Sequence, residues 1–368
     1  MKAISQGDNT YDIFDDSLKV YNQLPPNSYT VRFSDRRGFY LEKYSDINIT
    51  ESKIYGLHEE KVKKVLNSFS EMERSLGVIL SGEKGTGKSL FAKLLAIKAI
   101  KLSMPVIIVD NFIPGISSYI ESIEQKAMIL FDEFDKTFGE IKTPEGQTSP
   151  QSSLLSLFDG LSGGKKLYVI TCNNLNKLSE YFINRPGRFH YHLRFGYPSS
   201  DEIRQYLKDK LIPEYYEEIE SVVEFASKID LNYDCLRSIA FELNHGILFS
   251  KAIKDLNIVH LEKESYKLIL QYTNGESISN KNRELDMFEL EESISVYMYS
   301  ASDDYVAIIS FIPRNAVYDY KIGGYIVPGD KIRITYDGDE DINEKFKQYT
   351  PKQLLIMKKK AKNLHYVL

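Results

Sequence analysis

Residues 82–89 read Gly82-Glu83-Lys84-Gly85-Thr86-Gly87-Lys88-Ser89 and satisfy the pattern G-x-x-x-x-G-K-[ST]. The apolar residues 77–80 precede this segment, and a helical pattern, SLFAKLLAIKAIKL, begins at its last residue. Glycines let main-chain N–H groups curl around phosphate oxygens, and the start of a helix adds partial positive charge. We therefore expect a phosphate-binding loop for ATP, with Lys88 at the β- and γ-phosphates and Ser89 on Mg²⁺. The predicted nucleotide contacts extend to Leu90.

An apolar strand ending in two acids is expected at residues 128–133, Met-Ile-Leu-Phe-Asp-Glu. Taken in isolation, this segment also fits a buried strand with a solvated acidic end. Beside a phosphate-binding loop, the carboxylate of Asp132 is the expected partner of the Mg²⁺ shell, and Glu133 is placed to polarise an attacking water.

Short apolar strands are predicted at residues 77–80, 106–109, 128–131 and 167–170, with helical segments between them. This alternation is typical of an α/β fold with a parallel sheet, whose ligand lies at the carboxyl ends of the strands. Residues 29–33 and 39–44 flank the polar turn SDRRG and predict a β-hairpin ahead of this region.

A third strand, residues 167–171, ends at Cys172-Asn173-Asn174, and the segment Arg185-Pro186-Gly187-Arg188 follows it. With these motifs in order, the chain resembles the AAA+ ATPases, specifically the AAA group proper. Residues 152–189 are similar to the LL-x-x-DG helix, sensor-1 strand and RPGR segment of that group, and within it to the mitochondrial Rieske-protein translocase subgroup. The resemblance covers about residues 54–260.

The resemblance implies a P-loop NTPase sheet with a helical lid. It makes Asn173 the sensor-1 residue that helps Glu133 orient water, with Asn174 as the fallback assignment. It also implies that Arg185 and Arg188 contact the γ-phosphate held by a neighbouring subunit; the alternative for both is surface salt bridging on a turn. A cation supplied in trans is worth about 10³ to 10⁵ in rate.

Four weaker assignments keep two interpretations each. Tyr55-Gly56 matches the adenine-pocket segment of the family but equally fits an ordinary turn. Arg237 is a candidate sensor-2 residue or a solvated helix residue. Phe112, in the segment 112–115, is an abbreviated pore loop or packs against the second helix. A polar loop at residues 136–151 could line a channel or contact a partner.

The chain is expected to divide into a β-rich segment at 1–53, an α/β nucleotide-binding subdomain at 54–198, a helical lid at 199–265 and a β-rich domain at 266–368. Ser199 and Glu202 have the spacing of a capping box at the start of the lid. A lysine-rich terminal helix is predicted from about residue 351. Its lysines form a solvated face or contact a nucleic acid or acidic partner; they are Lys352, Lys358, Lys359, Lys360 and Lys362.

The composition of the chain excludes several classes of protein. A formal charge of −5 gives no global cationic field, and two distant cysteines with six scattered histidines exclude a disulfide scaffold and structural zinc. No secretory signal or membrane span is visible in the sequence, so we expect a cytoplasmic protein, bacterial or in the host cytoplasm of a virus. The preferred function is an Mg²⁺-dependent ATPase ring, a hexamer by resemblance, that remodels a protein partner. A nucleic-acid loader or translocase and a slow ATP-gated assembly scaffold are the alternatives.

Overall fold

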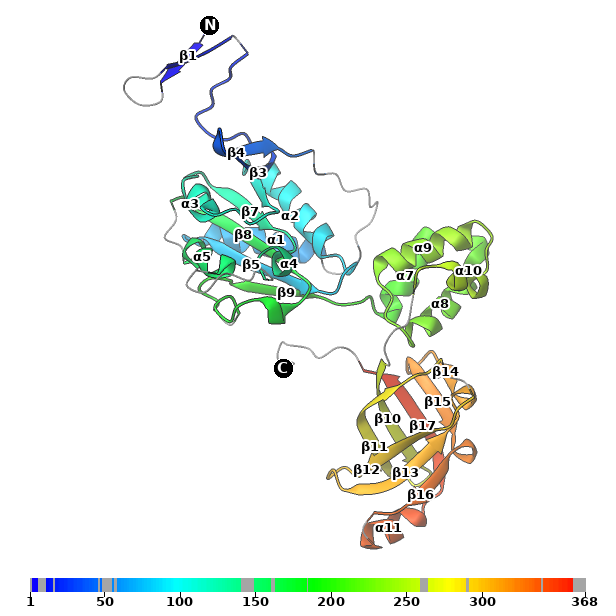
Figure 1. The fold of residues 1–368 in the computed structure, drawn as a ribbon. Helices are drawn as coiled ribbons and strands as arrows, with labels where there is room; N and C mark the ends of the chain where they lie inside the picture. The colour runs from blue at the N-terminus through cyan, green and yellow to red at the C-terminus, as the bar shows by residue number, and fades with distance from the viewer. Residues whose placement is uncertain are drawn as a thin grey trace. The chain divides into compact units, whose positions relative to one another are not determined.

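The computed structural model describes residues 2–5, 11–15, 17–45, 47, 55, 58–139, 149–159, 163–183, 185–258, 264–288, 291–338 and 340–359. These residues fall into two units, Met1–Gly196 and Tyr197–Leu368 (Figure 1). Within the described part of the chain, no helix combines the length and apolar character that crossing a bilayer requires.

The first unit contains a seven-stranded sheet of order β4-β3-β6-β7-β8-β5-β9. Its strands are β3 (Ser28–Ser34), β4 (Gly38–Lys43), β5 (Leu76–Gly82), β6 (Val106–Val109), β7 (Ala127–Phe131), β8 (Lys166–Cys172) and β9 (Tyr191–Phe195). All neighbouring pairs are parallel except β3 and β4, which form the predicted hairpin. Because β3 pairs with β6, this hairpin is the edge of the seven-stranded sheet and not a separate element.

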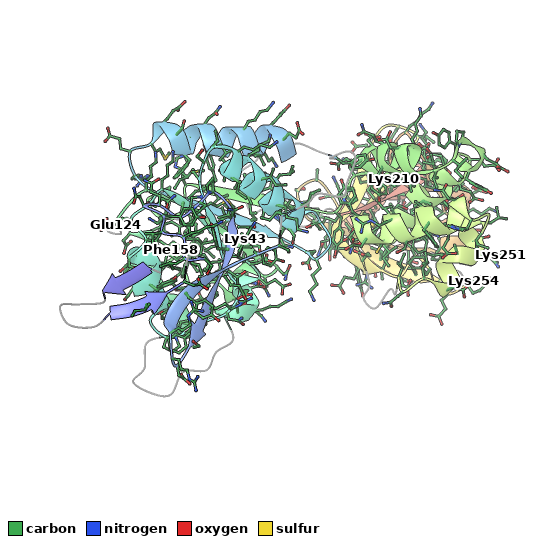
Figure 2. The ribbon with its side chains drawn as sticks, turned by 90° about the horizontal axis from the view of Figure 1, so that it is seen from above. Lys43, Glu124, Phe158, Lys210, Lys251 and Lys254 are labelled. Atoms are coloured by element: carbon green, nitrogen blue, oxygen red, sulfur yellow. The ribbon has the colours of Figure 1, made fainter. Side chains whose placement is uncertain are left out.

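Helices cover both faces of this sheet, as the alternation of strands and helices predicts. They are α1 (His58–Glu71), α2 (Lys88–Lys101), α3 (Ile116–Glu121), α4 (Phe134–Thr137), α5 (Pro150–Ser153) and α6 (Leu155–Phe158). Successive residues of a strand point to opposite faces. Accordingly, Val78 and Leu80 pack with α1 and α2, while Ile79 packs into the core on the other face, which includes Phe158. Figure 2 shows Phe158 inside this unit.

A second hairpin, β1 (Lys2–Ser5) with β2 (Tyr11–Phe14), forms a separate two-stranded sheet that the sequence patterns did not predict.

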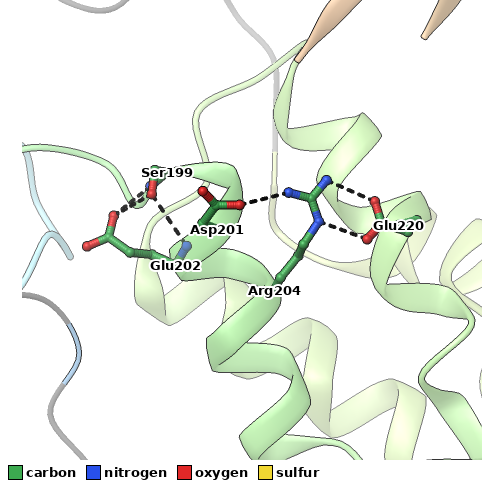
Figure 3. A network of polar contacts seen from close by, with 5 residues as sticks. All are labelled: Ser199, Asp201, Glu202, Arg204 and Glu220. Carbon is green, nitrogen blue, oxygen red and sulfur yellow. Dashed lines mark hydrogen bonds and ion pairs between the residues drawn. The ribbon is translucent and has the colours of Figure 1, made fainter. Parts of the chain in front are cut away.

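The second unit begins with the predicted helical lid, α7 (Ser200–Lys210), α8 (Glu218–Ala226), α9 (Tyr233–Asn244) and α10 (Phe249–Asp255). The capping box is present: the Ser199 main-chain N–H donates to Glu202 Oε2 at 2.8 Å, and the Glu202 N–H donates back to Ser199 Oγ. One turn later, Arg204 donates to both carboxylate oxygens of Glu220 on α8, at 2.8 and 3.0 Å, and to Asp201 (Figure 3). These contacts fix α7 against α8.

The rest of the second unit is an eight-stranded antiparallel sheet of order β14-β15-β17-β10-β11-β12-β13-β16. Its strands are β10 (Glu264–Tyr272), β11 (Ser277–Leu285), β12 (Ile294–Tyr299), β13 (Tyr305–Phe311), β14 (Val317–Asp319), β15 (Gly324–Pro328), β16 (Arg333–Tyr336) and β17 (Pro351–Lys358), with α11 at Glu340–Lys347. One apolar cluster contains side chains from strands near both ends of this order, including Tyr325 and Ile309. A β-rich C-terminal domain is therefore present.

The predicted terminal helix from about residue 351 is wrong. Residues 351–358 form strand β17, inserted between β10 and β15. Leu354 and Ile356 are fully buried at the two-residue period of a strand. Lys358, predicted to lie on a solvated face or to contact a partner, is instead largely buried and pairs with Asp230 at 2.9 Å and Glu264 at 3.1 Å. Lys360 and Lys362 lie outside the described residues.

Candidate functional site

The phosphate-binding loop connects β5 to α2 and depends on glycine at three positions. Gly82, Gly85 and Gly87 have φ angles of 147°, 74° and 101°. These angles lie in a region that residues with a Cβ rarely adopt. A Cβ on Gly82 would also lie 1.9 Å from the carbonyl oxygen of Phe195, so no side chain fits there. Gly87 caps α2 without a side-chain hydrogen bond, which leaves the first-turn N–H groups to bind an anion.

Lys88 is held inside this loop. Its Nζ donates to the carbonyl oxygens of Gly82 and Glu83 at 2.6 and 2.7 Å, and the residue is buried. Burial lowers the pKa of the amine, and the neighbouring Cys172 and three nearby carboxylates oppose this shift. Thr86 stiffens the same turn by donating to the Glu83 carbonyl at 2.7 Å. The loop thus surrounds an ammonium group, and phosphate oxygens bound in the loop could accept hydrogen bonds from it.

The other predicted residues of this segment have different environments. Ser89 is exposed on the first turn of α2, where its hydroxyl is available to a metal ion. Glu83 and Lys84 are exposed. Leu90 is half-buried and packs against the core formed with α1 and α2. The structure thus places the Leu90 side chain in a packing role.

The predicted catalytic groups converge because their strands are neighbours. Strands β7, β8 and β5 are adjacent and parallel, and they end directly before Asp132, Asn173 and the phosphate-binding loop. The carboxyl ends of parallel strands meet at one edge of a sheet. The structure therefore places the phosphate loop, the two acids and Asn173 at the same edge.

Asp132 and Glu133 are organised by a side chain from β8 that the sequence analysis missed. Thr171 Oγ donates to Asp132 Oδ1 at 2.6 Å and accepts the main-chain N–H of Glu133 at 2.8 Å. Glu133 has a positive φ of 48°, and its half-exposed carboxylate pairs with Lys136. In this structure the side-chain partner of Glu133 is therefore a lysine of α4, the helix that begins at the next residue.

The two asparagines after β8 differ in what their side chains do. Asn173 is half-buried directly after the strand. Asn174 uses its side-chain oxygen to accept the N–H of Asn176, and its own N–H donates to Asp135 Oδ2 at 3.0 Å. Because the Asn174 amide oxygen is engaged locally, the geometry favours Asn173 as the sensor.

Asp135 is a second residue that the sequence analysis missed. It is 3% exposed, and its Oδ1 has no hydrogen-bond partner among the described residues. It lies close enough to Lys88 and Cys172 to raise the pKa of both, while burial of the Cys172 thiol raises the pKa of that group to about 12. The third acid in Asp-Glu-Phe-Asp was the sequence signal that could have identified it.

The two predicted trans arginines differ in their exposure and in their hydrogen bonds. Arg188 is largely buried and donates through Nε and Nη2 to both oxygens of Asp159, and through Nη1 to the Tyr181 carbonyl at 3.1 Å. Arg185 is exposed, with its guanidinium 5.2 Å from the centre of the Tyr181 ring. Arg185 is therefore the one presented to solvent.

The residues of the weaker assignments also have different environments. Tyr55 is buried, and Gly56 lies outside the described residues. Arg237 is exposed on α9 and pairs with Asp234 at 3.4 Å, as a solvated helix residue would. Phe112 packs edge-on against Phe138, with ring centres 5.9 Å apart, which supports its packing interpretation. Residues 140–148 of the polar loop lie outside the described part of the chain.

The residues present fit a magnesium nucleotide. Ser89 and Asp132 offer hydroxyl and carboxylate oxygens, which Mg²⁺ prefers, and it usually combines few protein ligands with phosphates and waters. No cluster of three or more His, Cys, Asp or Glu side chains that could hold a metal by itself occurs among the described residues.

Comparison with known proteins agrees with this geometry. Residues 78–197 match the family model of the "ATPase family associated with various cellular activities (AAA)". The chain contains an AAA ATPase domain. The matched region runs from β5 to the start of the lid and includes the phosphate-binding loop, both acids and both arginines. The predicted AAA resemblance is confirmed, and the finer resemblance to the translocase subgroup stays a prediction.

Relatives of this AAA domain are distant and much longer. Tat-binding homolog 7 of Caenorhabditis elegans is 27% identical over 219 residues, which cover 52% of this chain and 17% of that protein. A cell division cycle protein 48 homolog of Archaeoglobus fulgidus is 28% identical over 148 residues, 37% of this chain and 20% of that protein. The peroxisomal ATPase PEX6 of Yarrowia lipolytica is 25% identical over 224 residues, 51% of this chain and 21% of that protein. The chain thus spans about a fifth of these relatives.

Proposed function

We propose that this protein is an Mg²⁺-dependent ATPase that assembles into a ring, a hexamer by family resemblance, and remodels a protein partner. The observation that carries the ATPase proposal is the meeting of three features at one edge of the sheet: the glycine loop around Lys88, the acids after β7, and Asn173 after β8. Remodelling of a protein partner is favoured by the resemblance to the AAA group and by the formal charge of −5, which gives no overall cationic field for nucleic acid. The distant relatives include a peroxisomal ATPase and a cell division cycle protein homolog.

Each group has a defined part in the proposed reaction. Main-chain N–H groups of residues 82–89 and the Lys88 ammonium bind the phosphates, and Ser89 and Asp132 hold the metal. Bound Mg²⁺ supplies charge neutralisation at the transferred phosphoryl group. Glu133 accepts a proton from the attacking water, and Asn173 orients that water. Arg185 supplies positive charge to the γ-phosphate held by the neighbouring subunit, so hydrolysis depends on assembly.

Hydrolysis by Glu133 is tested by the isosteric Glu133→Gln variant. Because the amide cannot accept the proton, we expect ATP binding to persist while turnover falls at least about 100-fold. Turnover is followed by phosphate release and binding by titration with a fluorescent ATP analogue. The matched control is Glu180→Gln, at an exposed glutamate outside the site. Wild-type turnover in Glu133→Gln would contradict the assignment of the catalytic base.

The same variant identifies the class of partner, because an ATP-bound ring should retain what it acts on. Affinity capture with Glu133→Gln, followed by mass spectrometry, should yield a protein absent from a Lys88→Ala capture. Native mass spectrometry of the ATP-bound variant measures the number of subunits. ATPase stimulation by single-stranded nucleic acid that falls steeply with salt would instead favour a loader or translocase.

A slow ATP-gated scaffold is the second candidate, and the position of Phe112 favours it. A residue that grips a threaded polypeptide must be free to contact it, whereas Phe112 packs against Phe138. If the protein is such a scaffold, Phe112→Ala should leave ATP turnover and partner binding unchanged while lowering the melting temperature. Loss of remodelling with full ATPase activity and an unchanged melting temperature would restore the pore-loop interpretation.

The C-terminal β domain is proposed as the element that chooses the partner. It lies outside the region that the family model matches, so it is the part of the chain that sets this protein apart from a bare AAA module. Deleting the residues after the lid should remove partner capture by Glu133→Gln.

A further inference from the structure

Thr171 connects the two acidic residues of the candidate site. Its hydroxyl donates one hydrogen bond, to Asp132 Oδ1 at 2.6 Å, and accepts one, from the Glu133 N–H at 2.8 Å. A hydroxyl has one proton to donate and lone pairs to accept with, so both contacts form together. Thr171 is 2% exposed on β8, whereas both acids follow β7.

The hydrogen bond from the Glu133 N–H to Thr171 is made by a residue whose backbone conformation is unfavourable. Glu133 has φ 48° and ψ 46°, the left-handed region, which is disfavoured for a residue with a Cβ. At Glu133 the main chain turns away from the direction of β7, and helix α4 begins at the next residue. The hydrogen bond from Glu133 to Thr171 holds the main chain where the turn occurs, and the turn sets the direction of the Glu133 side chain.

The contact with Asp132 fixes a carboxylate that would otherwise rotate. With Oδ1 held by Thr171, the orientation of the carboxyl plane is defined, and Oδ2 is left for the metal shell. Groups that orient a metal ligand in this way typically change metal affinity or activity by about 10- to 100-fold when removed.

We infer that Thr171 is a positioning residue for ATP hydrolysis, acting through Asp132 and Glu133. It orients the carboxylate that holds the metal and the main chain that carries the catalytic base. This inference rests on the proposed ATPase function. Neither the AAA match nor the motif patterns assigns a role to this hydroxyl.

The chain offers a matched control at Thr30. This threonine is also 2% exposed on a strand of the same sheet, β3, but its hydroxyl has no hydrogen-bond partner among the described residues. Replacing either threonine by valine keeps shape and removes the hydroxyl. Thr30→Val therefore reports the effect of losing a buried hydroxyl, and Thr171→Val adds the loss of the two contacts.

The test compares full-length wild type, Thr171→Val, Thr171→Ser and Thr30→Val. We expect Thr171→Val to lower kcat about 10- to 100-fold and to raise the Mg²⁺ concentration for half-maximal turnover, with KM for ATP little changed. Thr171→Ser, which keeps the hydroxyl, should restore most of the turnover and the Mg²⁺ requirement. Thr30→Val should match wild type in all three quantities.

Several outcomes overturn the inference. Wild-type kcat and Mg²⁺ dependence in a folded Thr171→Val would show that the hydroxyl positions nothing. Equal losses in Thr171→Val and Thr171→Ser would show a packing role only. If Thr171→Val does not fold, Thr171→Ala carries the same comparison. Absence of Mg²⁺-dependent turnover in wild type would instead overturn the proposed ATPase function, and with it this inference.

Discussion

Asp159 accepts two hydrogen bonds from Arg188, one from Nε and one from Nη2, the latter at 2.8 Å. The Arg188 side chain is 13% exposed, and its remaining terminal nitrogen donates to the Tyr181 carbonyl. Arg185, three residues earlier, instead extends into solvent beside the Tyr181 ring. One arginine of this segment therefore braces the turn from within the chain, and the other is exposed to solvent.

The two arginines should separate by function when each is replaced by alanine. Arg185→Ala should keep nucleotide affinity and stability while turnover falls, by about 10³-fold if it acts as a trans arginine. Arg188→Ala should cost about 1 to 2 kcal/mol in free energy of unfolding, because it leaves Asp159 without its charged partner. Urea denaturation and phosphate release measure the two effects.

Mixed assemblies provide the control for action in trans. Arg185→Ala subunits mixed with Lys88→Ala subunits should regain activity where an intact arginine faces an intact phosphate loop. Inert mixtures of variants that demonstrably co-assemble would contradict the trans role.

Lys88 should determine nucleotide affinity. In Lys88→Met the side chain keeps its length and loses its charge, so a triphosphate loses a charge-assisted contact. We expect ATP affinity to fall about 10- to 100-fold, as measured by fluorescent-nucleotide titration. Lys93→Met, at an exposed lysine of the same helix, should bind as wild type does. Unchanged affinity in Lys88→Met would remove the basis of the phosphate-loop assignment.

Much of this site could be predicted because its determinants are local. The glycines at 82, 85 and 87 occupy the conformations that the motif requires, and the acids follow a strand that is apolar throughout. Parallel pairing of β5, β8 and β7 then brings the carboxyl ends of these strands to one edge of the sheet.

The contacts that could not be predicted depend on tertiary neighbours. Thr171 contacts the two acids because β8 pairs with β7. Arg188 is hydrogen-bonded within the chain because Asp159 lies beside it in the fold. Strand β17 was misread because its lysines suggested a solvated helix face. Its pairing partners, β10 and β15, lie far away in the sequence, and Lys358 finds its acids only in the folded chain.

The lid and the β domain should behave as one body, because a hydrogen-bonded tyrosine connects them. Tyr325 on β15 shares a 2.7 Å hydrogen bond with Ser227, just after α8, and Phe225 of α8 packs against Phe288 with ring centres 5.6 Å apart. Tyr325→Ala should increase amide hydrogen exchange in α8 and separate the unfolding of the lid from that of the β domain. Tyr297→Ala, at an exposed tyrosine of the same sheet, is the matched control. Equal exchange in both variants would contradict this coupling.

Lys166 is a fully buried lysine at the start of β8. Its Nζ donates to the Gly163 carbonyl at 2.9 Å. Burial lowers the pKa of its amine from 10.5 to about 8, and Glu124 opposes part of that shift. The folded chain therefore releases this proton at a lower pH than the unfolded chain does.

Stability should rise with pH because of this lysine. Between pH of about 8 and 10.5 the unfolded state holds the proton and the folded state has lost it, so the free energy of unfolding increases with pH. Below pH 8 both states are protonated, and the buried charge gives its full penalty. Lys166→Met removes this contribution, so the wild-type stability relative to Lys166→Met should increase through that window. Urea denaturation at several pH values measures the difference, with Lys93→Met as the exposed control; a difference that stays constant with pH would show that Lys166 titrates normally.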